Sequence, residues 1–181
     1  MPLDIQKIQK GTTSWVHPSL DLRKSPIEGF GLFAKEKIKK GTKVSVFGGK
    51  VYTSDEIDKM PKNSYVANVA SQLDNDFFLG PLKKPKSAED YEWGFFVNHS
   101  CNPNTKIWRS VFLVAIKNIK PGDEITFNYA HSHNKGLGFT CKCGSKNCRK
   151  FVSNSDYLNK AFYTKNRSNI VGWMKDLVET A

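Results

Sequence analysis

The stretch Phe95-Phe96-Val97-Asn98-His99-Ser100-Cys101-Asn102-Pro103-Asn104 carries the most informative chemistry of this chain. An apolar run leads there into a turn-forming segment that holds an amide, an imidazole, a thiol and a proline. A polar loop whose Asn and Ser side chains cap its own backbone would explain part of this composition. Such a loop would have no need of the cysteine. We therefore interpret the segment as a site, with Asn98 and His99 at its centre.

The chain has four cysteines, and their spacing indicates a metal site. Cys141, Cys143 and Cys148 form a Cys-x-Cys-x4-Cys pattern well after Cys101. Cysteines one residue apart bond poorly to each other, whereas their thiolates can share one metal ion with a third from the next turn. Cys101 would complete a tetrahedral, structural zinc site that joins the chain's end to the Asn98 loop. Two disulfides or buried free thiols are the alternatives, and the lack of a secretory opening disfavours them.

Composition sets the outer bounds. A chain of 181 residues, 39% hydrophobic and 12% aromatic, can bury one substantial core. No apolar run approaches the ~20 residues that span a bilayer, so we expect an intracellular protein without membrane contact. Its 28 Lys and Arg against 17 Asp and Glu give a net charge of +11. This excess favours polyanions such as nucleic acid as partners, although a well-solvated basic surface explains it equally well.

Local patterns predict a body of short strands. Residues 1–20 have no sustained period, and an entry strand is the most we expect there. Gly29-Phe30-Gly31 permits a sharp turn and a close approach of backbone to ligand, with a plain tight turn as the alternative. We expect a short helix over 55–62, strands over 64–70 and 77–80, and a loop over 81–86.

An internal repeat supports the same class. Residues 34–46 resemble residues 115–127, and each copy reads as strand, turn and strand. Pro121-Gly122 fits the centre of a type II turn. The strand after it would alternate, with Ile125, Phe127 and Tyr129 on one face and Thr126 and Asn128 on the other. Gly and Pro turn signals that recur about every ten residues are typical of antiparallel β proteins.

Helical spacing returns near the C-terminus. Ile170, Val171, Met174, Leu177 and Val178 predict a helix, and a shorter one is expected over 156–163. We expect these helices to cover the strands. His131 and His133 follow the Tyr129 strand in a polar loop. They could form a metal pair, but two imidazoles without an acid or thiol nearby more often decorate a loop.

Four ordered motifs make residues 25–151 similar to the SET-domain protein lysine methyltransferases. They are Gly29-Phe30-Gly31, Phe47-Gly48-Gly49, the Asn98 to Asn104 segment, and Gly122-Asp123-Glu124-Ile125-Thr126-Phe127-Asn128-Tyr129. The cysteine triplet resembles the family's post-SET zinc segment. The resemblance implies a mainly β fold of small curved antiparallel sheets, with a pseudoknot that passes the Tyr129 segment beneath the Asn98 loop. It divides the chain into a lead-in (1–20), a SET domain (21–133), a post-SET zinc segment (134–152) and a helical extension (153–181).

The same resemblance implies a site. S-adenosylmethionine would be bound by Gly29, Phe30, Gly31, Asn98 and His99, with a contact from Tyr65. Tyr129 would be the catalytic tyrosine, and Phe127 and Phe151 would line the substrate channel. Family members often have Tyr, Arg and Asp where this chain has Phe47, Phe95 and Asn128. Lys35 or Lys37 is our candidate to replace that Arg at the cofactor's carboxylate.

We therefore expect methylation of lysine side chains in a protein, with a histone or other chromatin protein as candidate substrate. Methyl transfer from a sulfonium to an amine requires a neutral lysine and an aligned donor, and a narrow apolar channel favours the neutral amine. Phenylalanine at position 127 points to di- or trimethylation. Such an enzyme would lie in the nucleus of a eukaryote and otherwise in the cytoplasm. The alternative is a catalytically silent peptide- or nucleic-acid-binding module with the same fold.

Overall fold

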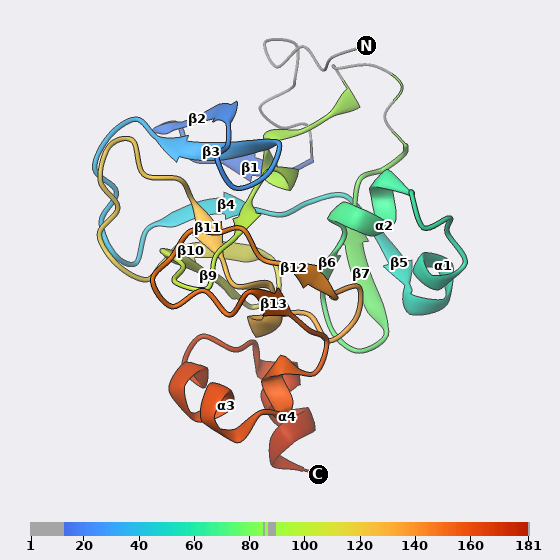
Figure 1. Cartoon of the computed structure of the whole chain (residues 1–181). Coiled ribbons are helices and arrows are strands. Elements are labelled where there is room, and N and C mark those ends of the chain that lie inside the picture. Colours follow the sequence, from blue (N-terminus) through green and yellow to red (C-terminus); the bar gives the residue numbers. More distant parts are fainter. Residues whose placement is uncertain (1–12, 85, 87–89, 181) are drawn as a thin grey trace.

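The computed structural model describes residues 13–84, 86 and 90–180, so the first twelve residues of the expected lead-in lie outside it. Short strands fill the middle of the molecule, with one pair of helices beside β5 and β7 and another pair at the C-terminal end (Figure 1). The expected mainly β class is confirmed. Among the described residues, no helix has the length and apolar character needed to cross a membrane.

The largest sheet has four antiparallel strands in the order β1-β4-β10-β9. Its strands are β1 (Trp15–Val16), β4 (Lys43–Val46), β10 (Phe112–Ala115) and β9 (Thr105–Trp108). Register pairs Val16 with Ser45, Ser45 with Leu113, and Leu113 with Ile107. All four side chains of this row are buried, because they face the main core.

The two copies of the sequence repeat pair with each other. Ile38 and Ile119 exchange backbone hydrogen bonds of 3.0 and 2.9 Å, and both side chains are buried. The amide of Gly41 donates to Ala115, and the amide of Gly122 donates reciprocally to Ala34. Both glycines have positive φ, 89° and 85°, which a turn of this kind needs. The repeat thus builds two equivalent turns that close on one another.

Four smaller sheets complete the β structure. β2 (Leu20–Lys24) pairs with β3 (Phe30–Ala34), and β12 (Phe139–Thr140) pairs with β13 (Phe151–Val152), both antiparallel. A three-stranded sheet has the order β5 (Lys50–Thr53), β7 (Phe77–Gly80), β6 (Ser71–Gln72). The expected strand over 77–80 is therefore present. β8 (Asn98–His99) and β11 (Thr126–Phe127) are parallel, which places the Tyr129 segment beside the Asn98 loop.

The strand expected over 64–70 is wrong, because the chain forms helix α2 (Tyr65–Val69) there. Ser64 caps this helix by accepting a hydrogen bond from the amide of Ala67. Val66 and Ala70 then lie one helical turn apart and pack on Tyr52 and Phe78 in a small second core. A short, mostly apolar stretch is compatible with either structure, so the tertiary contacts select the helix.

The other helices fall near their expected places. α1 (Ser54–Asp58) begins with a capping box between Thr53 and Glu56. The C-terminal segment forms the 3-10 helix η5 (Asp156–Leu158), α3 (Lys160–Asn166) and α4 (Gly172–Glu179). One 3-10 helix was not expected from the sequence: η3 (Trp93–Phe95), which precedes the Asn98 loop. Met174 of α4 is fully buried in the main core, so the C-terminal helices are part of the folded body as well as its cover.

Candidate active site and metal centre

Asn98 connects three segments that are distant in sequence. Its side-chain amide donates to the carboxylate of Glu124 over 2.7 Å, and to the carbonyl oxygens of Phe30 and Glu28 over 3.0 and 3.1 Å. A Cβ on Gly31 would lie 2.2 Å from the Glu124 carboxylate. The Gly-Phe-Gly segment is therefore held against Asn98 by contacts that only glycine at position 31 allows.

Glu124 is a site residue to which sequence reasoning assigned no role. Besides Asn98, its carboxylate accepts hydrogen bonds of 2.9 Å from the hydroxyl of Ser25. A partly buried carboxylate needs such donors. The available signal was its position in the Gly-Asp-Glu motif before Tyr129, where an acid is unusual in a segment that becomes buried.

His99 is buried and neutral. Its Nδ1 accepts a hydrogen bond of 3.1 Å from the amide of Tyr129, and its ring meets Tyr129 and Phe139 edge-on at 5.2 and 5.5 Å. Burial, followed by the positive charge of Arg149 and by His131, lowers the pKa of His99 to about 3. The imidazole therefore acts as a fixed acceptor that positions the start of the Tyr129 segment.

Tyr129 does not lie on a strand, contrary to the prediction. β11 ends at Phe127, and the 3-10 helix η4 (Tyr129–His131) follows it. The two predicted faces also fail to separate, because Thr126 and Asn128 are as buried as Ile125 and Phe127. The segment passes through the core with both sides covered, so no polar face is exposed.

The Tyr129 hydroxyl is held in place and stays protonated. It donates a hydrogen bond of 2.9 Å to the carbonyl oxygen of Val97. Burial raises the pKa of Tyr129, and the negative charge of Glu124 raises it further. A neutral phenol with its proton committed to a carbonyl presents its lone pairs to whatever binds beside it.

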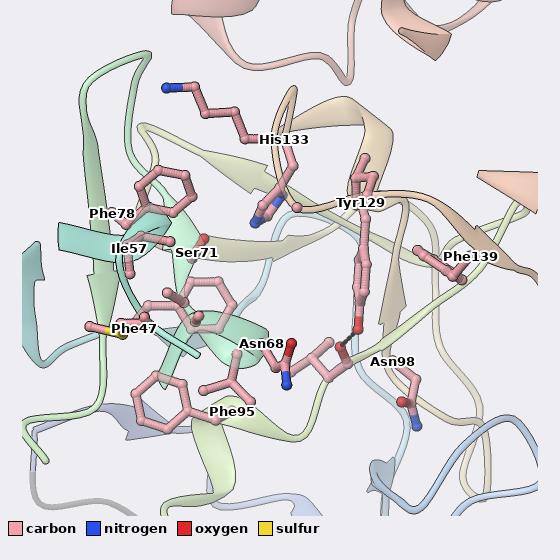
Figure 2. Close-up of a pocket in the computed structure, with 18 of the residues that line it drawn as sticks. Phe47, Ile57, Asn68, Ser71, Phe78, Phe95, Asn98, Tyr129, His133 and Phe139 are labelled. Carbon is pink, nitrogen blue, oxygen red and sulfur yellow. Dashed lines mark hydrogen bonds between the residues drawn. The ribbon is translucent and has the colours of Figure 1, made fainter. Parts of the chain in front are cut away.

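Two adjoining cavities share Tyr129, Asn98, Phe139 and Glu28 in their walls. The smaller, about 460 Å³, also has His99 and Lys142 in its wall. The larger, about 640 Å³, reaches the β5-β7-β6 sheet and its two helices, where Ser71 of β6, Ile57 of α1 and Asn68 of α2 line it. Figure 2 shows Tyr129 and Phe139 on one side of it, with Phe47, Phe78 and Phe95 across from them.

Phe127 lines the larger cavity and packs on Tyr129, with ring centroids 4.7 Å apart. Phe151, the other predicted channel residue, lies in β13, is 54% exposed, and lines neither cavity. Phe139 of the paired strand β12 lines both cavities instead. Its only sequence signal was its place two residues before Cys141. Lys35 and Lys37 also line neither cavity, whereas Lys142 lines the smaller one.

Tyr65 is brought toward the site only indirectly. Its ring contacts Tyr91 at 4.9 Å, and Tyr91, Phe96 and Phe30 continue the chain of rings at 6.1 Å each. Its hydroxyl is buried without a hydrogen-bond partner among the described residues, and burial raises its pKa. Tyr65 lines neither cavity. The connection to Phe30 passes through two intervening rings.

His133 lines the larger cavity and is not the exposed loop residue that the sequence analysis favoured. Its ring lies 6.3 and 6.1 Å from those of Phe127 and Tyr129, and the amide of Gln72 donates to its Nε2 over 3.3 Å. Burial lowers its pKa to about 4. The next residue, Asn134, also bonds to Gln72: it exchanges two hydrogen bonds, 2.8 and 3.0 Å, with the Gln72 side chain. This contact holds the β5-β7-β6 sheet against the Tyr129 segment.

The four cysteines converge as expected. The sulfur atoms of Cys101, Cys141, Cys143 and Cys148 all lie within 4.8 Å of one another, and no disulfide joins them. Cys101 and Cys141 sulfurs are 3.8 Å apart, which matches the about 3.8 Å between thiolates that hold zinc tetrahedrally at about 2.3 Å. The donor set is closed and all sulfur, so it fits a structural zinc ion.

Arg149 joins this cluster to the rest of the molecule, and the sequence showed no sign of it. Its amide donates to the Cys101 sulfur over 3.4 Å. Its guanidinium donates to the side chain of Asn128 over 2.9 Å, pairs with Asp156 at 3.0 Å, and lies over the ring of Phe162 at 4.5 Å. The metal segment is thereby fixed to both the Tyr129 segment and the C-terminal helices.

With this geometry in place, comparison with known proteins assigns the family. The SET domain family matches residues 29–130, and the chain belongs to it. Among curated proteins, the H3 lysine-9 specific histone-lysine N-methyltransferase of Fusarium mangiferae is 33% identical over 74% of this chain and 48% of its own length. The lysine-9 specific enzyme of Schizosaccharomyces pombe is 30% identical over 80% of this chain and 34% of its own length.

Other relatives are named for a different target lysine, lysine 36 of histone H3 in place of lysine 9. The human H3 lysine-36 specific histone-lysine N-methyltransferase is 31% identical over 75% of this chain and 5% of its own length. The fold is shared with KRYPTONITE, solved in complex with mCHH DNA, an H3(1-15) peptide and SAH, with a TM-score of 0.57, 23% identity, and coverage of 76% of this chain and 30% of that one. This chain spans less than half the length of each of these proteins.

Proposed function

We propose that this chain transfers methyl groups from S-adenosylmethionine to lysine side chains of a protein substrate. The observation that carries the proposal is the meeting of two cavities at Tyr129, whose hydroxyl is fixed on the Val97 carbonyl. A donor and an acceptor that enter from separate sides would meet at this residue. Homologues of the chain are histone-lysine N-methyltransferases.

The smaller cavity is our cofactor site. Its volume suits a ligand of the size of S-adenosylmethionine, and it lies beside the Gly29 to Gly31 segment that Asn98 holds in place. Lys142 supplies a positive charge for the cofactor's carboxylate and takes the role that we expected of Lys35 or Lys37. Its present ion pair with Glu28, 3.4 Å and well exposed, costs little to exchange. Tyr65 would support this site through the rings that connect it to Phe30.

The larger cavity is our lysine site. The cofactor supplies an electrophilic methyl group on a sulfonium, so the protein has to align the amine and keep it uncharged. Phe127, Phe139 and the ring of Tyr129 remove water from the amine, and desolvation lowers its pKa. The lone pairs of the Tyr129 oxygen then orient the amine, while the hydroxyl keeps its proton and donates it in a hydrogen bond to the carbonyl oxygen of Val97. The neutral His133 closes the wall without adding charge.

The four cysteines hold a structural zinc ion in this proposal. A closed all-sulfur site has no open position for substrate. Its role is therefore structural: through Cys101 and Cys141 it joins the Asn98 loop to β12 and β13. That connection places Phe139 in the channel, because Phe139 lies two residues before Cys141. The zinc segment is thereby part of the wall that both ligands share.

For the substrate we propose a basic histone tail, with histone H3 as the first candidate. Glu28 and Asp58 line the larger cavity together with Lys62 and Lys135, and the two carboxylates offer partners to Lys and Arg residues beside the target. Relatives named for lysine 9 and for lysine 36 are similarly identical to this chain, so the target lysine is left open. A histone substrate places the protein in a nucleus. The room beside Phe127 favours di- or trimethylated products.

Transfer of label from S-adenosylmethionine to purified core histones tests the proposal. We expect label on histone H3 with the unmodified protein and almost none with Tyr129→Phe. Tyr163→Phe is the matched control, because its hydroxyl donates to Glu179 beside Arg167 near the C-terminus and Tyr163 lines neither cavity. Binding of S-adenosylhomocysteine by calorimetry separates the two ligands. Absence of both binding and label would overturn the function, whereas binding without label would overturn the histone substrate alone.

A further inference from the structure

A row of partly exposed aromatic residues crosses the outer face of the four-stranded sheet. Register pairs Trp15 with Val46, Val46 with Phe112, and Phe112 with Trp108, so these side chains share one face and lie in line. Trp15 is 46% exposed and Trp108 39%. With strands about 4.8 Å apart, the row is roughly 15 Å long. The adjacent row on the opposite face is fully buried, so the exposure is a property of this face and not of loose packing.

Cations lie directly against this row. The Lys43 ammonium is 4.8 Å from the ring centroid of Phe112 and 5.8 Å from that of Trp108. The Arg109 guanidinium is 4.5 Å from the centroid of Trp108. Register also places Lys106 on this face, through Val114. Among the described residues, no carboxylate forms an ion pair with any of these three cations.

The charge around Lys106 is positive as well. Burial, and then the positive charges of Lys175 and Lys40, lower the pKa of the Lys106 ammonium. The Lys106 ammonium donates a hydrogen bond of 2.7 Å to the carbonyl oxygen of Ser168, so it adds positive charge beside the row from a fixed position. Rings that offer stacking surface, bordered by uncompensated positive charge, form a surface complementary to a chain of bases and phosphates.

We propose that the outer face of the β1-β4-β10-β9 sheet binds single-stranded nucleic acid. Bases stack on the row from Trp15 to Trp108, and phosphates meet Lys43 and Arg109, while Lys106 adds positive charge beside them. Stacking is tolerant of sequence, because every base has an aromatic face. A sheet with two or three stacking rings is an established way to hold that many bases. The ligand chemistry is common to RNA and DNA, and the experiment separates the two.

The single-stranded form is favoured over a duplex because paired bases hide their faces inside the helix. A duplex would use the lysines and leave the aromatic row without a role. An acidic peptide would likewise use the cations alone. The exposed tryptophans are the feature that decides among these ligands.

This face is separate from the proposed methyl-transfer site. None of the four residues of the row, nor any of the three cations, lines either cavity. The sheet also lies away from α1 and α2, which border the larger cavity (Figure 1). Nucleic acid on this face and a peptide in the channel can therefore be bound together, and changes to the row leave methyl transfer to a short peptide intact.

Fluorescence anisotropy with labelled homopyrimidine strands of about ten nucleotides, as RNA, as DNA and as duplex, tests the proposal. We expect both single strands to bind more tightly than the duplex and to quench tryptophan emission. Trp108→Ala should weaken binding about tenfold, while Trp108→Phe should retain most of it. Phe77→Ala is the matched control, because Phe77 is 42% exposed on a different sheet. If one of the two single strands binds more tightly, that strand identifies RNA or DNA as the ligand.

A second variant keeps the test decisive if Trp108→Ala does not fold. Lys43→Gln with Arg109→Gln changes two exposed side chains and should reduce the dependence of binding on salt, because fewer phosphates are neutralised. Ultraviolet crosslinks should map to Trp15, Trp108 or Phe112. Equal binding by all variants, or a duplex bound as tightly as the single strand, overturns the proposal. So does a dimer in sedimentation that Trp108→Ala dissociates, since a second copy would then occupy the face.

Discussion

The hydroxyl of Tyr129 and the carbonyl oxygen of Val97 are joined by a hydrogen bond of 2.9 Å at the boundary of the two cavities. Tyr129→Phe removes that bond and the proposed orienting oxygen but keeps the ring. We expect turnover to fall by at least ~10²-fold, a barrier increase of ~2.7 kcal/mol. Affinity for S-adenosylhomocysteine should change little, and stability should fall by about 1 kcal/mol. Steady-state kinetics on a histone peptide measure the effect, and full activity would remove Tyr129 from the mechanism.

Phe127 sets the space beside the lysine amine. A tyrosine at this position adds a hydroxyl that needs a partner in a buried wall, and a water or the amine itself would supply it. That partner takes the volume that a second or third methyl group requires. We expect the unmodified protein to reach di- or trimethyl-lysine and Phe127→Tyr to stop mainly at monomethyl-lysine with a similar first step. Mass spectra over a full time course decide this. An unmodified protein that stops after one methyl contradicts the assignment.

Asn98 should matter to both cofactor binding and folding. Asn98→Ala leaves the carboxylate of Glu124 and the carbonyls of Phe30 and Glu28 without their donor. We expect a stability loss of about 1–3 kcal/mol together with weaker binding of S-adenosylhomocysteine. Asn102→Ala, at an exposed position in the same loop, is the control and should leave both unchanged. Calorimetry and thermal denaturation report the two effects, and unaltered affinity in Asn98→Ala places the cofactor elsewhere.

Zinc content follows from the cysteine cluster. We expect one zinc ion for each chain purified without chelator. Cys143→Ser should lose the metal and, through Arg149, loosen the C-terminal helices, which limited proteolysis would detect. Ser145→Ala is the neighbouring control that keeps all four thiolates. Metal analysis that finds no zinc in the unmodified protein contradicts the structural role of the cluster.

His131 should make stability fall in acid. Burial, and then the positive charge of Arg149, lowers its pKa from 6.5 to about 4. Below pH 6.5 the unfolded chain therefore binds a proton that the folded chain excludes, so stability falls as pH drops from 6.5 to about 4 and is unaffected by this group outside that window. The loss is about 3 kcal/mol at the lower limit.

Comparison with His131→Phe isolates this effect from other acid-sensitive groups, the thiolates included. The variant keeps a ring beside Phe162, which lies 5.7 Å from the His131 ring. Denaturant unfolding at several pH values should show a shallower decline for His131→Phe than for the unmodified protein. Parallel curves would mean that His131 is protonated in the folded protein.

The sequence predicted which distant segments come together better than it predicted the local structure of those segments. Asn98, His99, Phe127 and Tyr129 lie in two continuous motifs, and β8 and β11 bring those motifs together. The helix at Tyr65–Val69 could not be predicted, because a mostly apolar stretch of five residues fits either structure. Tyr129 was placed on a strand for a different reason. Alternating periodicity indicates a strand with one exposed face, whereas this segment is buried on both sides.

Chemistry that depends on residue type was determined by the sequence alone. The count and spacing of the cysteines, the glycines of the first motif, the Asn-His pair and the basic charge are all present in the unfolded chain. Contacts between distant segments were decided only by the tertiary structure. It placed Phe139, and not Phe151, in the walls of the two cavities. It also brought Glu124 within hydrogen-bond distance of Asn98 and aligned Trp15 with Trp108 across four strands. Such contacts depend on strand register and chain closure, and neither is encoded within any one stretch.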